Sequence, residues 1–114
     1  MKLLPLAAHF AAVSLLTAGS LAAQAPDGQA IYRSECRVCH GAAGKPTQMA
    51  LNLHRGIPTF DSTFFSRRTQ DSIVAVLNHG AGTDMKSFKD KLSAQEILAV
   101  AKYLKETFGS GASH

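Results

Sequence analysis

The sequence predicts an all-α domain, and three observations support this prediction. Apolar residues recur at the spacing of an α-helix in separate stretches of the chain. A residue that commonly caps helices precedes each of three such stretches, namely Asp27, Thr69 and Ser93. No segment shows the sustained alternation of apolar and polar residues that is typical of a strand. We therefore expect three to four helices that are joined by long loops.

Residues 1–23 have the features of a secretory signal peptide. A positively charged residue follows Met1, residues 3–18 are mostly apolar, and small residues come next. Cleavage close to Ala23 leaves one small domain, residues 24–114, although several neighbouring peptide bonds suit the cleavage. The sequence therefore predicts that the domain is exported.

The composition excludes several classes of protein. The 114 residues carry a formal net charge of +4, which is too weak a positive charge for a typical nucleic-acid-binding domain. No apolar stretch beyond the signal peptide is long enough to span a bilayer. Two cysteines are too few for a disulfide-stabilised scaffold. A domain of this size commonly needs a metal, a cofactor or a covalent link for its stability.

A first helix is expected over Gly28–Cys39. Asp27 precedes it as the N-cap, and Ile31 and Tyr32 lie on its inner face. The end of this helix coincides with the two cysteines of the chain. The first helix therefore carries both thiols at its C-terminal end.

The sequence Cys36-Arg37-Val38-Cys39-His40 has the C-x-x-C-H pattern of covalent haem attachment. Two thiols three positions apart can reach the two vinyl groups of one haem and form thioethers with them. The adjacent imidazole of His40 then lies under the iron and can bind it. A disulfide, a redox-active dithiol and a zinc site completed by His54 and His79 remain as alternatives. Export favours haem attachment among these alternatives.

The segment Gly41–Ser66 is expected to be a loop, apart from a short helical turn within Asp61–Ser66. It contains three glycines and two prolines and shows no sustained apolar period. A structureless stretch of this length is unusual in a compact domain. A haem removes the difficulty, because the loop can then pack on the cofactor.

Two further helices are expected after this loop. One begins after Thr69 and ends near Asn78 or Gly80, and a loop over residues 81–92 follows it. The segment Ser93-Ala94-Gln95-Glu96 forms a capping box that begins the last helix. The apolar residues of the last helix follow at helical spacing: Ile97, Val100, Ala101, Leu104 and Phe108. A polar tail is expected from Gly109 onward.

These features together resemble the class I cytochromes c, which are small monohaem electron carriers. The resemblance is most specific in four segments, which are Cys36–His40, Gly82–Phe88, Leu92–Ile97 and Ala101–Leu104. It implies the small cytochrome c fold, in which helices and long loops surround one covalently bound haem c.

The resemblance also assigns the residues of the site. It implies that Cys36 and Cys39 form the haem thioethers and that His40 binds the iron. In the family, a methionine in the loop before the last helix binds the iron on the opposite side, and Met85 occupies that place. The first and last helices of the family cross at a glycine and two aromatic residues. The matching residues here are Gly28, Tyr32 and Tyr103.

The sequence departs from the family pattern close to the iron ligands. Lys86 follows Met85 where the family often has proline, so we expect a less rigid loop. Leu51 lies near the place of a proline whose carbonyl accepts the proton of the haem-binding histidine. Tryptophan is absent from the sequence, so other residues must bind the haem propionates. The candidates are Arg55, Thr59, Arg67 and Arg68.

Other residues compete for the role of Met85 as iron ligand. His79 is the main rival, although it lies just before a glycine at the end of a helix, where a charged or hydrogen-bonded histidine is common. Met49 and His54 lie in the preceding loop, and we expect His54 at the surface or near a propionate. Seven apolar residues are expected to cover the haem: Leu53, Ile57, Phe60, Phe64, Val76, Leu92 and Leu98.

A haem iron with both axial positions filled has no open position for a substrate. This favours the transfer of single electrons, and a methionine ligand also favours the ferrous state. No residues resemble a catalytic acid, base or nucleophile, so we do not expect an enzyme. The alternatives are a haem-based ligand-binding sensor and a cytochrome subunit of a larger oxidoreductase.

A redox protein is the expected partner, and the bacterial periplasm is the expected location. Lys86, Lys89 and Lys91 follow Met85 closely and are expected to surround the exposed haem edge, with Lys45 on the facing loop. Their charge would steer an acidic docking surface into place. Nucleic acid is not expected as a partner. A membrane is expected only if the signal peptide stays uncleaved or if the partner is a membrane-bound oxidoreductase.

Overall fold

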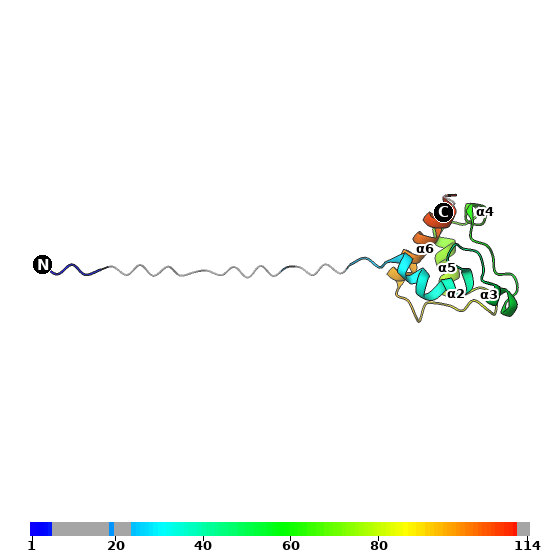
Figure 1. Ribbon diagram of the computed structural model, residues 1–114, viewed down its shortest axis with the longest axis horizontal. Helices are drawn as coiled ribbons and strands as arrows, with labels where there is room; N and C mark the ends of the chain where they lie inside the picture. The colour runs from blue at the N-terminus through cyan, green and yellow to red at the C-terminus, as the bar shows by residue number, and fades with distance from the viewer. Residues whose placement is uncertain (6–18, 20–23, 112–114) are drawn as a thin grey trace.

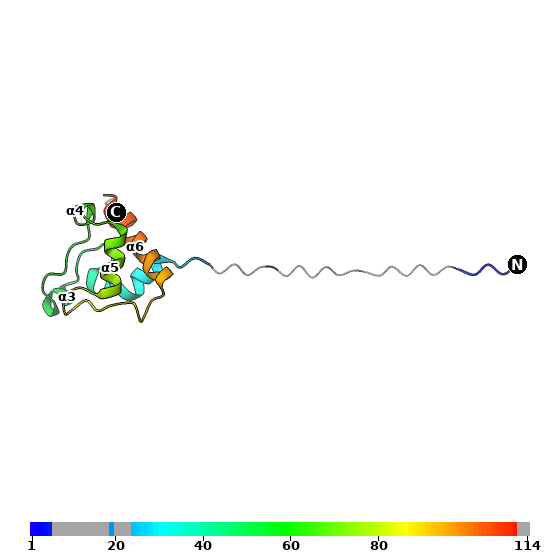
Figure 2. The same cartoon turned by 180° about the vertical axis from the view of Figure 1, so that it is seen from behind.

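The computed structural model describes residues 1–5, 19 and 24–111 (Figures 1 and 2). The described residues form helices and no strand beyond an isolated bridge between Ala81 and Met85. The prediction of an all-α fold is therefore confirmed. Most of the predicted signal peptide lies outside the described residues, as does the end of the predicted tail. None of the helices in the described part of the chain has the length and apolar character to cross a membrane.

The predicted first helix consists of three consecutive segments. These are α1 (Gly28–Ile31), a π-helical turn η1 (Tyr32–Cys36) and α2 (Arg37–His40). The Asp27 carboxylate caps α1, because it accepts hydrogen bonds of 2.9 and 3.1 Å from the backbone N–H groups of residues 29 and 30. The helical segment therefore continues to His40, one residue beyond its predicted end.

Helix α3 (Gln48–Leu53) interrupts the segment that was predicted to be a loop, so that prediction is wrong here. The Thr47 hydroxyl accepts a hydrogen bond from the Ala50 N–H (3.2 Å) and donates one to the Val38 carbonyl (2.9 Å). The Thr47 N–H also donates to the Cys39 carbonyl (3.1 Å). Thr47 thus caps α3 and attaches it to the end of α2.

The remaining helices agree closely with the predictions. Helix α4 is Ser62–Ser66, α5 is Gln70–His79 and α6 is Ala94–Gly109. The capping box before α6 is present, with Ser93 and Glu96 exchanging hydrogen bonds of 2.7 and 3.2 Å. The predicted polar tail begins one residue late, since Gly109 still belongs to α6.

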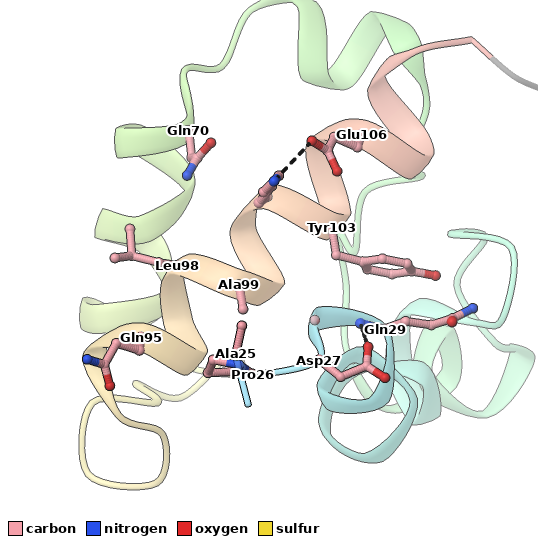
Figure 3. Close-up of a pocket in the computed structure, with 12 residues that line it drawn as sticks. Ala25, Pro26, Asp27, Gln29, Gln70, Gln95, Leu98, Ala99, Tyr103 and Glu106 are labelled. Atoms are coloured by element: carbon pink, nitrogen blue, oxygen red, sulfur yellow. Dashed lines mark hydrogen bonds and ion pairs between the residues drawn. The ribbon is translucent and has the colours of Figure 1, made fainter. Parts of the chain in front are cut away.

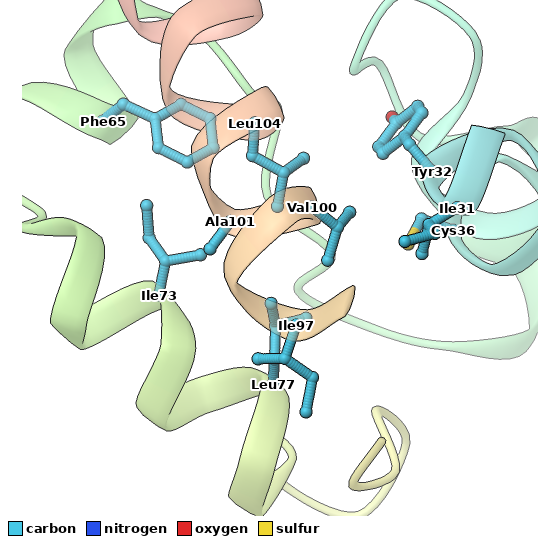
Figure 4. Close-up of a cluster of buried hydrophobic side chains, with 10 residues drawn as sticks. All are labelled: Ile31, Tyr32, Cys36, Phe65, Ile73, Leu77, Ile97, Val100, Ala101 and Leu104. Carbon is cyan, nitrogen blue, oxygen red and sulfur yellow. The ribbon is translucent and has the colours of Figure 1, made fainter. Parts of the chain in front are cut away.

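Helix α6 packs on α1, α4 and α5 (Figure 1). Its inner face carries four buried residues, which Figure 4 shows between side chains of the first helix and of α5: Ile97, Val100, Ala101 and Leu104. Burial of these apolar side chains is the main stabilising contribution of the core. The apolar positions that the sequence placed on the inner face of this helix are thus confirmed, except that Phe108 is only half-buried.

The crossing of α1 and α6 depends on Gly28. A Cβ at this position would lie 2.8 Å from the Tyr103 Cβ and would collide with the Ala99 carbonyl oxygen. The rings of Tyr32 and Tyr103 lie beside the crossing with their centroids 5.6 Å apart. The predicted contact of the first and last helices through these three residues is confirmed.

Candidate functional site

The two cysteines lie at the end of the first helix. Cys36 is buried in the core beside Tyr32, Cys39 is half-buried, and both are free thiols (Figure 4). Burial is the main reason that the pKa of the Cys36 thiol rises to about 11; Glu35 and Cys39 raise it further, and Lys91 opposes them. A redox-active dithiol typically has a thiol whose pKa is lowered. The raised pKa of Cys36 therefore lends no support to the dithiol alternative.

His40 ends α2 and offers a neutral imidazole. Its ring stacks on Phe60, with the centroids 4.4 Å apart and the planes 14° apart. The Nδ1 atom is buried and has no hydrogen-bond partner among the described residues. Burial lowers the pKa of His40, which keeps the imidazole neutral and able to bind a metal. Two free thiols and an unpaired buried imidazole at one helix end fit the covalent attachment of a haem.

Met85 lies in the loop between α5 and α6. Its backbone forms two hydrogen bonds with Ala81, of 2.9 and 3.3 Å, which close a tight turn. The Ser87 hydroxyl donates to the Asn78 carbonyl (2.5 Å), and the Phe88 N–H donates to a carbonyl of α5 (2.8 Å). The half-buried Met85 side chain packs against the hydrophobic core. The thioether is thus held on the inner side of a loop that is attached to α5.

The two histidines considered as alternative ligands lie elsewhere. His79 is exposed at the end of α5. His54 follows α3, and its Nδ1 lies 3.2 Å from a carboxylate oxygen of Asp84 without the orientation of a hydrogen bond. No three His, Cys, Asp or Glu residues gather into a metal site within residues 24–111 or the other described positions. The zinc alternative therefore gains no support.

The apolar residues expected around the haem fall into three groups. Four of them are half-buried: Ile57, Phe60, Phe64 and Leu92. Leu53 and Val76 are 70% and 40% exposed, which leaves apolar surface for a large apolar cofactor to cover. Leu98 instead lines a shallow groove beside Pro26 and Gln95 on the outside of α6 (Figure 3). The expectation that Leu98 covers the haem is therefore wrong.

The residues proposed to bind the propionates differ in their availability. The Arg68 guanidinium lies 3.5 Å from the centroid of the Phe64 ring and donates a 2.7 Å hydrogen bond to the Phe64 carbonyl. Arg55, Thr59 and Arg67 are exposed. Arg68 is thus occupied by contacts within the protein, and the other three stay available.

Two residues near the site were missed in the sequence. Thr47 holds the end of α2, and no clear signal in the sequence identifies it, because helix α3, which it caps, is too short to show an apolar period. The Glu35 carboxylate forms an ion pair with Lys91, in the loop after Met85. Glu35 and Lys91 lie far apart in the sequence, so no local pattern could have indicated their contact.

Comparisons with known proteins agree with this geometry. A profile of the family described as "Cytochrome C oxidase, cbb3-type, subunit III" matches residues 23–104. A cytochrome c6 of Leptolyngbya boryana is 30% identical over 82 residues, which make up 72% of this chain and 91% of that protein.

Solved structures show the same similarity. The KustC0563 c-type cytochrome has a TM-score of 0.65 and 29% identity over 72% of this chain and 98% of its own. Cytochrome c6 of the diatom Phaeodactylum tricornutum has a TM-score of 0.58 and 27% identity over 74% of this chain and 93% of its own. The small cytochrome c fold that the resemblance implied is therefore confirmed. The chain belongs to the class I monohaem cytochrome c family, and its cofactor is a covalently bound haem c.

Proposed function

We propose that this monohaem electron carrier holds its haem through thioethers at Cys36 and Cys39, with His40 and Met85 as the two axial ligands of the iron. The observation that carries the proposal is the position of the two free thiols and the unpaired imidazole at the end of one helix. The half-buried thioether of Met85, on a loop attached to α5, supplies the second ligand.

The protein residues determine what the bound haem does. The haem itself supplies the one-electron chemistry, through the ferric and ferrous states of its iron. His40 binds as a neutral imidazole, because burial lowers its pKa. The Met85 sulfur favours the ferrous state and so raises the reduction potential. Because His40 and Met85 would both bind the iron, no position would remain for a substrate, and the protein would act as a carrier and not as an enzyme.

The sensor alternative requires that Met85 leave the iron easily. Lys86 replaces a proline that would stiffen the loop, and its ammonium group donates a 2.9 Å hydrogen bond to the Thr83 carbonyl within the same loop. The two hydrogen bonds between Met85 and Ala81 close the turn around this contact. These bonds favour a fixed methionine and hence the electron carrier.

The proposed location is the periplasm of a bacterium. The features of residues 1–23 favour export, and haem attachment to a C-x-x-C-H sequence takes place outside the bacterial cytoplasm in this family. We propose that the signal peptide is removed and that the mature protein is the cytochrome c domain, residues 24–114.

The proposed partner is a redox protein with an acidic docking surface. Lys86 and Lys89 are exposed close to Met85, where their charge can attract acidic groups. Lys91 differs from them, because it forms an ion pair with Glu35. We therefore assign the steering of the partner to Lys86 and Lys89.

A second function is favoured by the description of the matching family, which names a subunit of an oxidase. In that case the domain would stay bound to a membrane oxidoreductase. Purification from native membranes under mild conditions distinguishes the two: a carrier is recovered free of other chains, whereas a subunit co-purifies with them in fixed proportion.

Intact mass and absorption spectra test the proposal. A denatured protein should retain one haem, and C36A and C39A should each lose one thioether. The ferric protein should show the charge-transfer band of a methionine–iron bond, and the ferrous protein should bind carbon monoxide slowly. A denatured mass without haem would contradict the covalent attachment, and rapid binding of carbon monoxide would favour the sensor.

A further inference from the structure

An ion pair joins the loop that carries Met85 to the first helix. The Lys91 ammonium group contacts the Glu35 carboxylate, and their side chains are 64% and 19% exposed. Glu35 directly precedes Cys36. The ion pair therefore connects the segment that attaches the haem with the segment that contains the proposed sixth ligand.

A second polar contact reaches the same loop from another element. The Nδ1 atom of His54, which follows α3, lies 3.2 Å from a carboxylate oxygen of Asp84, and Asp84 directly precedes Met85. The remaining ion pair among the described residues, between Lys102 and Glu106, lies within α6. The long-range ion pair of the described residues, between Lys91 and Glu35, and the approach of His54 to Asp84 thus both lie at the loop.

The loop needs such contacts because its own bonds are mostly local. Met85 pairs with Ala81, and Lys86 donates to Thr83, so these bonds shape the turn but do not attach it to the first helix. The bonds from Ser87 and Phe88 attach the loop to α5 alone. Among the polar contacts of the described residues, the ion pair of Lys91 with Glu35 therefore connects the loop to the helix that carries the haem motif.

We propose that Glu35 and Lys91 are positioning residues, whose ion pair holds the loop against the first helix and keeps Met85 on the iron. This inference rests on the proposed ligation by Met85. Ion pairs that are partly exposed change equilibria by up to about five-fold. We therefore expect the pair to act on local opening of the loop, with little effect on global unfolding.

The test uses the haem-containing protein and compares E35Q, K91Q and the double variant with wild type. The rate at which carbon monoxide binds the reduced protein should rise about two- to five-fold in each single variant, because opening of the loop precedes binding. The double variant should show no larger increase, since all three variants remove one and the same contact. K102Q is the matched control, because Lys102 forms its ion pair within α6.

Hydrogen exchange supplies a second measurement. The amide protons of Met85 and Phe88 should exchange faster in K91Q, while the amide of Leu104 in the core of α6 should not change. The double variant with exchanged charges, E35K with K91E, should restore the wild-type rate of amide exchange. Lys91 is exposed, so K91Q keeps the test informative even if a change at the half-buried Glu35 impairs folding.

The outcomes separate the two hypotheses. If carbon monoxide binds E35Q and K91Q at the wild-type rate, the role of the ion pair is overturned. The same holds if the increase in the double variant equals the product of the increases in the two single variants. Wild type that binds carbon monoxide as rapidly as M85A would instead overturn the ligation by Met85 itself.

Discussion

The hydroxyl of Tyr32 donates a buried hydrogen bond of 2.7 Å to the backbone carbonyl of Gly41. Gly41 directly follows His40 and has a φ angle of 75°, which favours glycine. A Cβ at this position would collide with the Lys45 carbonyl. The hydrogen bond thus fixes the direction in which the chain leaves the haem motif.

Replacing Tyr32 by phenylalanine should lower the free energy of unfolding by about 1–3 kcal/mol, because the buried Gly41 carbonyl then lacks its partner. Urea denaturation of the haem-containing protein measures this difference. Y103F is the control, since the Tyr103 hydroxyl donates no hydrogen bond to the described residues. Equal losses in the two variants would show that the bond to Gly41 contributes nothing specific.

Alkaline pH should destabilise the folded protein through Tyr32. Burial raises the pKa of this phenol well above its usual value of about 10. Above that pH the unfolded chain loses the proton while the folded protein keeps it, so stability is complete below pH 10 and falls as pH rises. Ultraviolet titration should show a phenol that resists ionisation, and Y32F should remove it. If no phenol of the wild-type protein resists ionisation above pH 10, this prediction is refuted.

Valine at position 28 should overpack the crossing of α1 and α6. Its side chain would enter the space of the Ala99 carbonyl and the Tyr103 Cβ, at a cost of about 1–3 kcal/mol. A30V is the control, because Ala30 is exposed on the same turn of helix. Thermal unfolding measures the stability of the two variants, G28V and A30V. If G28V and A30V melt at the same temperature, Gly28 does not determine the crossing.

Substitution of Met85 by alanine should remove the methionine–iron charge-transfer band, lower the reduction potential and open the iron to carbon monoxide. H79A should leave the band unchanged, because His79 is exposed at the end of α5. Ferric absorption spectra and redox titrations of the two variants provide the measurement. The opposite pattern would identify a bis-histidine haem.

Charge reversal at Lys86 and Lys89 should slow electron transfer to an acidic redox partner, and the loss should shrink as salt is added. Stopped-flow rates over a range of ionic strength measure the effect. K102E is the control for net charge, since Lys102 lies on α6. Rates that do not depend on salt, or that fall equally in K102E, would exclude steering by the two lysines.

Local patterns were sufficient to predict most of the helices. The caps at Asp27, Thr69 and Ser93 and the apolar period of α6 depend on near neighbours in the sequence, and the structure contains each of them. The crossing at Gly28 was implied by the family resemblance, since the sequence alone does not show which helices approach each other. Its confirmation rests on the contact with Ala99.

Features that depend on tertiary contacts could not be predicted. Helix α3 has only six residues, too few for an apolar period, and it is stabilised by the bonds of Thr47 to α2. Leu98 fits the apolar composition of α6, but its angle on the helix directs it to the outer groove. The pairing of Lys91 with Glu35 likewise requires the folded chain. The iron ligation by His40 and Met85 stays a prediction.

The position of α6 has a consequence for biogenesis. Cys36 belongs to the first segment of the domain, whereas Val100 and Leu104, which are members of the same buried core, belong to the last. A chain that crosses a membrane with its N-terminus leading presents both thiols before α6 has emerged. If the chain is exported as proposed, haem attachment would therefore have access to the cysteines until α6 emerges and completes the core.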